Sequence, residues 1–578
     1  MAEFSLAQDN LSPGQSNATD NPPGRVARIS YLKGSVSFLR AGLDQWSQAA
    51  INFPVTTGDR LYTDDNSRAE LQVGFLTVRI WERTDLTVTN LSDRIAQFGL
   101  QQGTLRVSVY SMPSDNTVEL DTPNGSLTIL DPGKYRVDTD PDGNRTTVTV
   151  NKGSLQITGG GVSETIDEGE AVQLTGQDSV EISRVPVPAP DSFDDWSNER
   201  DRRRSDSTSS EYVNPYTPGY EDLDDYGHWT EVDVYGPVWF PTVPVGWVPF
   251  RFGYWAWVDP WGWTWMADEV WGFCTFHYGR WVFIRGAWGW LPGPMVLVPV
   301  YAPALVAFLG GPSFSAGFGV DLVGWFPLGP VDPFFPWYHS TFDYVQQVNI
   351  TNIRNVTNIT QIIHVDNINN VHYAYKDIAT TAVPASVLSS GQPVAQHAVK
   401  LTPEQVAKAQ VIPHPTVNPT PRAAMPGKPV PPPPTASKTT VTSNRIPGAG
   451  GKAQPSSGAM NKEPERTPPV PERSPHTRPP TTSAAVPPRT SPARLITRMA
   501  PLPPPIPFHQ RQEAMAEHPG RSLEPIQVQN LLAGKPAGPH HDVEFPPHPE
   551  ALVPKTKTSS PPKFNHPTSG KNHGSEAK

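Results

Sequence analysis

The residues whose side chains could take part in catalysis lie close together in the middle of the chain. Cys274 is the only cysteine, His277 follows it by three residues, and Asp268 and Glu269 come shortly before both. A cysteine beside a histidine can form a nucleophilic pair, and two carboxyl groups can act as general acid and general base. Residues three apart on an extended strand, however, lie about 10 Å apart and face opposite sides. Adjacent carboxylates diverge in the same way, so we expect no catalysis at this cluster.

The sequence also lacks the patterns of the common cofactor and metal sites. A single cysteine cannot form an intramolecular disulfide, a CxxC pair or a cysteine-rich zinc site. No phosphate-binding loop, HExxH motif or dinucleotide fingerprint is present. The net charge is −10 and no folded segment carries a basic stripe, so nucleic-acid binding is not expected. We therefore predict a protein that is not an enzyme and that uses no metal and no cofactor.

An aromatic repeat changes the interpretation of the cysteine–histidine stretch. "YGHW", "FGYW" and "YGRW" begin 26 residues apart, and a second aromatic-Gly pair follows each by nine or ten residues. The polar positions change between copies, so we expect His277 and Arg280 to be solvent-facing or rim variants of a structural motif. The positions that recur are Tyr226, Gly227, Trp229, Phe252, Gly253, Trp255, Tyr278, Gly279 and Trp281.

Each unit of this repeat is predicted to be two short aromatic strands joined by a turn. One strand pair cannot bury its own aromatic face, but tandem copies can bury theirs against one another. Residues 226–337 hold 14 of the 17 tryptophans, and we expect most of these to form a core. Four that crowd into nine residues cannot all be expected to point inward, and they are the candidates for binding a glycan: Trp257, Trp261, Trp263 and Trp265.

The N-terminal region shows the period of β-strands. Between residues 25 and 184, apolar residues alternate with polar ones, as in Leu76–Ile80 and Leu105–Val109, and turn residues such as Asp142-Gly143 separate the runs. This pattern predicts an all-β domain of many short strands. The turn at Gly58-Asp59 is interpreted as backbone chemistry rather than as a ligand site.

Several motifs of this region occur in a characteristic order. They are "TTGDRLYTDDNSRAELQVG" (Thr56–Gly74), "QQGTLRVSVY" (Gln101–Tyr110), "VELDTPNGSLTILDPGKYRVDTDPDGNRTTVTVNKGSLQI" (Val118–Ile157) and "EGEAVQL" (Glu168–Leu174). In this order they resemble the FecR-like domain of bacterial envelope proteins. The resemblance implies a periplasmic or extracellular β module without known catalysis. Signalling members of that family carry an anti-sigma segment and one membrane helix ahead of the domain.

A second resemblance covers about residues 226–345. The order of Tyr-Gly-x-Trp, Trp-Gly-Trp, "HYGRW", "LPGP" and "PALVAFLGG" is similar to an uncharacterised Trp-rich region found after FecR-like domains. The resemblance implies a domain context and no activity. The apolar run Met295–Gly311 contains two prolines and lacks Lys/Arg anchors, so we predict a buried, strand-like segment rather than a membrane helix.

The remaining segments are expected to lack a packed core. They are 1–24, with "FSLAQDN" resembling the end of a signal peptide; 185–225, a charged flexible linker; 346–380, an extended or irregular arm of Asn triplets; and 381–578, a proline-rich disordered tail. The predicted chain is therefore mainly β, with a FecR-like domain at 25–184 and a Trp-rich β-repeat domain at 226–345.

Three functions remain open on the sequence alone. The leading hypothesis is a non-enzymatic envelope protein, periplasmic or extracellular, with a structural or interaction role. The second is a glycan or peptidoglycan binder that uses exposed tryptophans, and the third is a FecR-type signalling regulator. The expected partner is an envelope glycan or another envelope protein. A cytoplasmic location is the alternative to the envelope. The sequence does not predict an oligomeric state.

Overall fold

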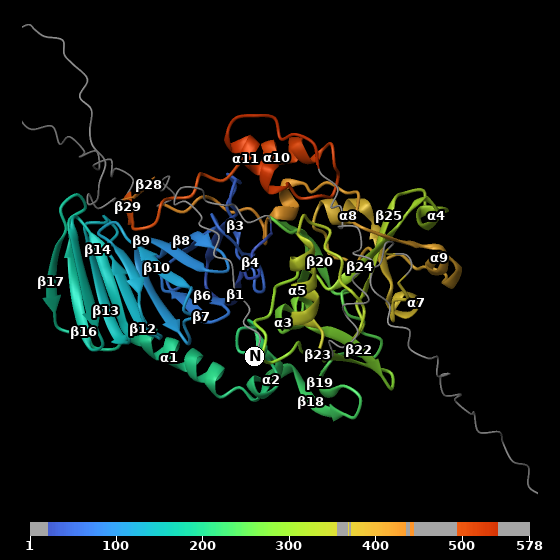
Figure 1. The fold of residues 1–578 in the computed structure, drawn as a ribbon, viewed down its shortest axis with the longest axis horizontal. Helices are drawn as coiled ribbons and strands as arrows, with labels where there is room; N and C mark the ends of the chain where they lie inside the picture. Colours follow the sequence, from blue (N-terminus) through green and yellow to red (C-terminus); the bar gives the residue numbers. More distant parts are fainter. Residues whose placement is uncertain (1–20, 355–367, 369–370, 435–439, 444–493, 541–578) are drawn as a thin grey trace, which may run out of the picture. The chain divides into compact units, whose positions relative to one another are not determined.

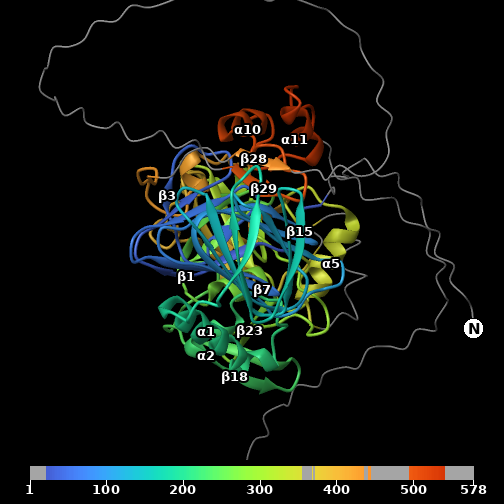
Figure 2. The same cartoon turned by 90° about the vertical axis from the view of Figure 1, so that its left-hand side faces the viewer.

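The part of the chain described by a computed structural model comprises residues 21–354, 368, 371–434, 440–443 and 494–540. These residues form a mainly β protein, as the sequence predicts, and the strands of its N-terminal region appear in blue and cyan in Figures 1 and 2. Across these ranges, no helix is long and apolar enough to cross a membrane. Residues 1–20, with the possible signal-peptide remnant, lie outside them.

The N-terminal domain is built from two sheets that enclose an apolar core. In spatial order the first sheet contains β4 (Pro54–Val55), β1 (Ala27–Lys33), β6 (Arg68–Val73), β7 (Leu76–Ile80), the C-terminal part of β9 (Ile95–Val109), β12 (Gly133–Thr139), β13 (Arg145–Lys152), β16 (Glu170–Thr175) and β17 (Glu181–Val185). The second sheet contains β3 (Ser47–Gln48), β2 (Val36–Leu39), β5 (Arg60–Thr63), β8 (Asp85–Leu91), the N-terminal part of β9, β10 (Thr117–Asp121), β11 (Ser126–Ile129), β14 (Ser154–Gly159) and β15 (Val162–Asp167).

Strand β9 belongs to both sheets and joins them into one domain. Its N-terminal part pairs with β8 and, in parallel, with β10, whereas its C-terminal part pairs with β7 and β12. The strand passes from one sheet to the other near Gly103, whose φ is +92°. A Cβ added there would lie 2.4 Å from Thr84 Oγ1. Only glycine adopts this backbone without strain, so the transition between the sheets depends on it.

The strand and turn predictions for this domain are confirmed. Leu76, Val78 and Ile80 are buried in β7, and Gly143 turns the β12–β13 hairpin with φ +66°. Asp59 has the structural role that the sequence predicts. Its carboxylate accepts hydrogen bonds from the backbone N–H groups of Thr56 (2.8 Å) and Ala41 (2.9 Å).

The segment 185–225 is not the flexible linker that its charge predicts. It contains α1 (Ser192–Ser205), η1 (Thr208–Glu211), η2 (Tyr220–Asp222) and α2 (Leu223–Tyr226). Ion pairs attach α1 to the first sheet: Arg79 lies 2.7 Å from Asp201, and Arg200 lies 2.7 Å from Glu70. Helices are usually recognised by an apolar stripe, and a helix held by charges leaves no such periodicity in the sequence.

Three consecutive hairpins correspond to the three 26-residue units. They are β18 (Gly227–Val232) with β19 (Gly236–Pro241), β20 (Gly253–Val258) with β21 (Gly262–Ala267), and β22 (Arg280–Ile284) with β23 (Ala287–Leu291). In each hairpin the tryptophan of the aromatic-Gly-x-Trp motif lies opposite a tryptophan of the second strand. The pairs are Trp229–Trp239, Trp255–Trp265 and Trp281–Trp290. The predicted repeat is therefore confirmed, and a cross-strand tryptophan pair defines its unit.

The glycine of each motif makes room for an indole ring from the opposite strand. A Cβ added at Gly227 would lie 2.6 Å from Trp239 Cζ2. At Gly279 the added Cβ would lie 2.8 Å from Trp290 Cε2, and Gly253 has the same relation to its opposite tryptophan. These separations are shorter than a carbon–carbon contact, so the glycine and the tryptophan pair are coupled parts of one motif.

Segments from later in the chain complete the Trp-rich body. A further sheet contains β26 (Thr381–Pro384), β25 (Leu322–Pro327), β24 (Val306–Gly310) and β27 (Gln410–Ile412), in that spatial order. The helices of this part are α3 (Gly272–His277), α4 (Pro312–Ser315), α5 (Phe342–Asn352), α7 (Lys376–Ala379), α8 (Ala385–Ser389), α9 (Pro403–Lys408) and η5 (Pro421–Ala424). The C-terminal elements are β28 (Thr440–Ser443), β29 (Arg494–Thr497), α10 (Phe508–Met515) and α11 (Pro525–Leu532).

Two predictions about the second half of the chain are wrong for the described residues. The first Asn triplets belong to helix α5 rather than to an extended arm, because Asn349 and Asn352 lie on its buried side and bond to backbone carbonyls. Residues 381–434 and 494–540 are folded rather than a disordered tail, because their few apolar side chains cover the tryptophan core. The remaining triplets and the rest of the tail lie outside the described residues.

We predict that Gly279→Ala destabilises the fold far more than Gly286→Ala does. Both glycines have positive φ, +70° and +86°, and alanine at such a backbone costs about 1 kcal/mol. At Gly279 the new methyl group would also lie 2.2 Å from the carbonyl oxygen of Leu291, and this overpacking adds about 2 kcal/mol. At Gly286 it meets nothing within 4 Å. Guanidinium unfolding followed by tryptophan fluorescence measures both losses, and equal losses would contradict the coupling of glycine to tryptophan.

Candidate functional site

The cysteine–histidine stretch forms a buried helix and not a strand. Cys274 and His277 both lie in α3 and are 0% and 2% exposed. Burial raises the pKa of the Cys274 thiol well above its usual range, which disfavours the thiolate that a nucleophile needs. The Nδ1 atom of His277 lies 2.8 Å from the carbonyl oxygen of Ala302, and its ring stacks on Tyr301 with centroids 4.8 Å apart. Both side chains are therefore parts of the core.

The prediction that His277 and Arg280 are solvent-facing is wrong. The Arg280 guanidinium is 1% exposed, with Nη2 3.1 Å from Asn349 Oδ1 and Nε 3.3 Å from the carbonyl oxygen of Asp332. Burial lowers the pKa of Arg280 to about 9, which Asp332 partly offsets. Polar residues vary at these positions because each copy of the hairpin meets a different covering segment, here helix α5.

The neighbouring carboxylates do not form a dyad. Asp268 is exposed, whereas the Glu269 side chain is half-buried and accepts a hydrogen bond of 2.7 Å from Trp247 Nε1. Burial raises the pKa of Glu269 to about 7. The backbone of the same segment is used for attachment, because Asn52 Nδ2 donates to the carbonyl oxygens of Glu269 (3.0 Å) and Val270 (2.9 Å). This segment therefore fastens the hairpins to strand-connecting residues of the N-terminal domain.

The four tryptophans proposed for glycan binding are buried. Trp257, Trp261, Trp263 and Trp265 are 0–1% exposed, so the expectation that they cannot all point inward is wrong. Cross-strand pairing places three of them on one face of the β20–β21 hairpin. The fourth, in the turn, packs against Tyr301 with ring centroids 5.2 Å apart. The covering residues are distant in sequence, as shown by the 3.2 Å hydrogen bond from Trp263 Nε1 to the carbonyl oxygen of Val417.

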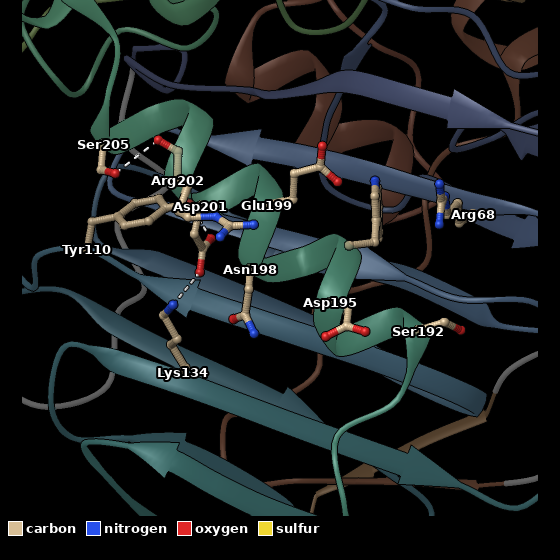
Figure 3. A pocket seen from close by; sticks show the side chains of 11 residues that line it. Arg68, Tyr110, Lys134, Ser192, Asp195, Asn198, Glu199, Asp201, Arg202 and Ser205 are labelled. Atoms are coloured by element: carbon tan, nitrogen blue, oxygen red, sulfur yellow. Dashed lines mark hydrogen bonds and ion pairs between the residues drawn. The ribbon is translucent and has the colours of Figure 1, made fainter.

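A charged hollow of about 820 Å³ lies beside helix α1 (Figure 3). Asp201 points toward Lys134 there, with the ammonium nitrogen 2.8 Å from its carboxylate. Burial raises the pKa of Asp201, but Arg79 and Lys134 outweigh this effect and hold it below its usual range. These pairs are the contacts that attach α1 to the sheet, so we interpret the charged residues of this hollow as structural and not as a ligand site.

A second hollow, of about 900 Å³, has a mainly apolar lining and lies under the C-terminal segment. Its walls are the extended stretch Pro501–Ile506, residues Thr56–Gly58 and the side chain of Trp261. Arg511 closes one side, since it pairs with Asp259 and donates to the carbonyl oxygen of Ala41 at 2.8 Å. Sequence reasoning missed this site because it assigned the stretch 501–506 to a disordered tail.

A buried pair of acids on strand β10 was also missed. Glu119 and Asp121 are both 0% exposed, and Gln97 Nε2 donates to both carboxylates, at 3.1 Å and 2.8 Å. Burial and the neighbouring Glu119 raise the pKa of Asp121 well above its usual range. The signal in the sequence is the alternation of these acids with Val118 and Leu120, which shows that they face away from the core. Among the residues that the structure describes, no group of three or more His, Cys, Asp or Glu could hold a metal.

In comparisons with known proteins, a family model matches part of the chain, and solved structures show a weak similarity. Residues 220–332 match the model of DUF6600, a family of unknown function. Two crystal structures of a candidate anti-sigma factor from Parabacteroides distasonis, at 1.65 Å and 2.50 Å resolution, show 11% identity and a TM-score of 0.20. The similarity covers 22% of this chain and 60% of the solved chain, so less than two thirds of that protein is represented. No curated protein matches the chain.

We predict that His277 makes the fold sensitive to acid. Burial lowers the pKa of His277 to about 4, below the ordinary value of 6.5, so the unfolded chain takes up the proton first. The stability that the folded protein has with a neutral His277 is therefore fully present above pH 6.5 and is lost as the pH falls toward 4. The free energy of unfolding should drop by about 2 kcal/mol between pH 7 and 4.5 through this group alone.

The measurement is urea unfolding across this pH range, with His277→Gln compared with the unchanged chain. His277→Gln should lack this part of the pH dependence. Substitution of the exposed His228 by Gln serves as the control and should leave the dependence intact. The same pH dependence in all three proteins would show that another group is responsible.

Proposed function

We propose that the protein is a non-enzymatic component of the bacterial cell envelope, periplasmic or secreted, with a structural or interaction role. In this role a FecR-like β module carries the Trp-rich body. The observation that supports it best is the use of the reactive side chains as internal contacts. Cys274 is fully buried, the His277 ring packs on Phe273 and Tyr301, and the carboxylate of Glu269 accepts a hydrogen bond from an indole.

The attachment of the two regions supports a role as one rigid unit. Arg28 of β1 is 1% exposed and pairs with Asp222, which precedes the first hairpin. Its guanidinium also lies over the ring of Phe273, 5.7 Å from the centroid. A buried ion pair fixes geometry even where it adds little net stability. The FecR-like assignment itself rests on the order of motifs in the sequence, with which the two-sheet β domain agrees.

Labelling of an introduced cysteine tests the envelope location. The native Cys274 is buried and should not react, so Ser163→Cys, at an exposed position of β15, provides the only reactive thiol. A membrane-impermeant maleimide should label Ser163→Cys in intact cells whose outer membrane has been permeabilised. The unchanged chain is the control and should stay unlabelled. Labelling of the variant only after lysis would place the protein in the cytoplasm and reject the proposal.

A complementation experiment tests the non-catalytic role. If deleting the gene changes detergent sensitivity of the cells, Cys274→Ala should restore the normal phenotype completely, because the thiol serves only as packing. The loss of one buried sulfur costs on the order of 1 kcal/mol, so protein levels must be measured in parallel. Failure to complement at a normal protein level would give Cys274 a chemical role.

A further inference from the structure

The outer face of the second sheet carries two rows of polar side chains. The strand register places one row across β8, β9, β10, β11 and β14 as Thr87, Gly99, Asp121, Ser126 and Thr158. The next row contains Gln97, Glu119, Thr128 and Gln156. Neighbours within a row are about 4.8 Å apart and the rows about 7 Å apart, as strand geometry dictates. The rows form a continuous surface of hydroxyl, amide and carboxyl groups, which we call the polar face.

Part of the polar face is buried without the hydrogen bonds that buried polar groups normally make. The hydroxyls of Thr87, Thr89 and Thr128 and the amide nitrogen of Gln101 have no hydrogen-bond partner among the described residues. Thr128 is 8% exposed and directly opposite Glu119. Buried polar groups without partners are costly. Thr87 and Thr89 line the second hollow described above, so a molecule that enters it can bond to their hydroxyls.

The acids in the centre of the polar face are likewise without a counter-charge. Neither Glu119 nor Asp121 has a Lys, Arg or His nitrogen within ion-pair distance in the described ranges. The amide of Gln97 and two backbone N–H groups donate to them, and the Ser126 side chain lies beside Asp121. Burial and the neighbouring Glu119 raise the pKa of Asp121, so its carboxyl can carry a proton and donate to a hydroxyl group as well as accept from one.

The C-terminal segment covers this part of the polar face. Leu495 of β29 is 0% exposed, and its Cδ1 atom would lie 2.5 Å from a Cβ added at Gly99. The backbone N–H groups of Arg498 and Met499 donate to Glu119 Oε1 at 3.2 Å and 3.4 Å. Leu495 fills the space that Gly99 leaves in its row, and the backbone N–H of Ile496 donates to the carbonyl oxygen of Thr122 at 2.9 Å, but the cover supplies no hydrogen-bond partner to the Thr128 hydroxyl. Gln156 and Thr158, at the far end of the rows, are only half-buried.

We propose that the polar face is a binding site for a neutral glycan and that the segment around β29 masks it. A neutral polyhydroxylated chain supplies the missing donors and acceptors to threonine, glutamine and the carboxyl pair at once. An acidic glycan would bring like charge to Glu119 and Asp121 and is rejected. The inference deepens the proposed envelope role and rests on it, but it involves none of the buried tryptophans.

The geometry also distinguishes a glycan from a peptide strand. A peptide that extends a sheet bonds to the free backbone groups of an edge strand. The polar face lies over β9, β10 and β11, which are paired on both sides, so only side chains are offered to a ligand. Rows of side-chain hydroxyl, amide and carboxyl groups match a chain that carries hydroxyl groups along its length.

The test opens the cover in the full chain and measures binding of defined oligosaccharides. Leu495→Asp places a third carboxylate over the acid pair, and Arg498→Pro removes a backbone donor to Glu119. By calorimetry, both variants should bind at least one of cellohexaose, chitohexaose and maltohexaose at least tenfold more tightly than the unchanged chain does. Hexagalacturonic acid should not bind to any of the three proteins.

Threonine-to-valine changes locate the site. In the Leu495→Asp background, Thr128→Val should weaken binding about fivefold, because one hydrogen bond is lost. Thr147→Val, a matched change on β13 of the first sheet, should have no effect. The proposal is overturned if neither opened variant binds a neutral hexasaccharide while circular dichroism shows the β fold. The proposal would also be overturned if both valine changes reduced the affinity for the neutral hexasaccharide equally. Tighter binding of hexagalacturonic acid or pentalysine than of the neutral hexasaccharides would overturn it as well. None of these outcomes affects the labelling test of envelope location.

Discussion

The two tryptophans that lie opposite each other in each hairpin are the constraint on which the Trp-rich body depends. A two-stranded sheet cannot cover so much apolar area, so the hairpins must be covered by other parts of the chain. Trp255, for example, packs on Trp265 across the hairpin and also on Phe308, Trp325 and Trp337 from later segments. The buried indole N–H of Trp325 is bonded within this body, since its Nε1 donates to the carbonyl oxygen of Phe250 at 2.8 Å. The later segments are folded because this surface needs them.

Charge plays the corresponding role in the N-terminal domain. Helix α1 has few apolar residues, yet it packs on the first sheet because arginines and acids alternate between the two elements. Glu70 lies between Arg79 and Arg200, each at 2.7 Å, and although burial raises its pKa, the two guanidiniums hold it far below the usual range. Such pairs stabilise little when exposed, but once buried they cannot be separated without leaving a charge unpaired. The helix is therefore held by these buried ion pairs together with Phe193 and Trp196, whose rings pack on Trp81 and Tyr31.

The features that the sequence predicted are those with a local cause. The hairpins follow from the 26-residue period, because the glycine and tryptophan positions interact within one unit. The β7 strand follows from the alternation at Leu76–Ile80. The failures have distant causes: Trp263 and His277 are buried by Val417 and Tyr301, which no local pattern connects to them. Of the candidate site, the sequence showed the alternation at Glu119 and Asp121, but it could not show that residues near 495 lie above them.

The two outer faces of the β domain differ in a way that points to a ligand. On the first sheet, the buried Glu70 meets Arg79 of the sheet and Arg200 of the capped helix α1, and Asp201 of that helix meets Arg79. On the second sheet, Glu119 and Asp121 have no arginine, lysine or histidine partner among the described residues, and Leu495 lies close by. Evolution of a permanent cover would be expected to supply counter-charges, as α1 does. A cover that leaves the acids unpaired is easier to displace, and it preserves the hydrogen-bonding groups for another occupant.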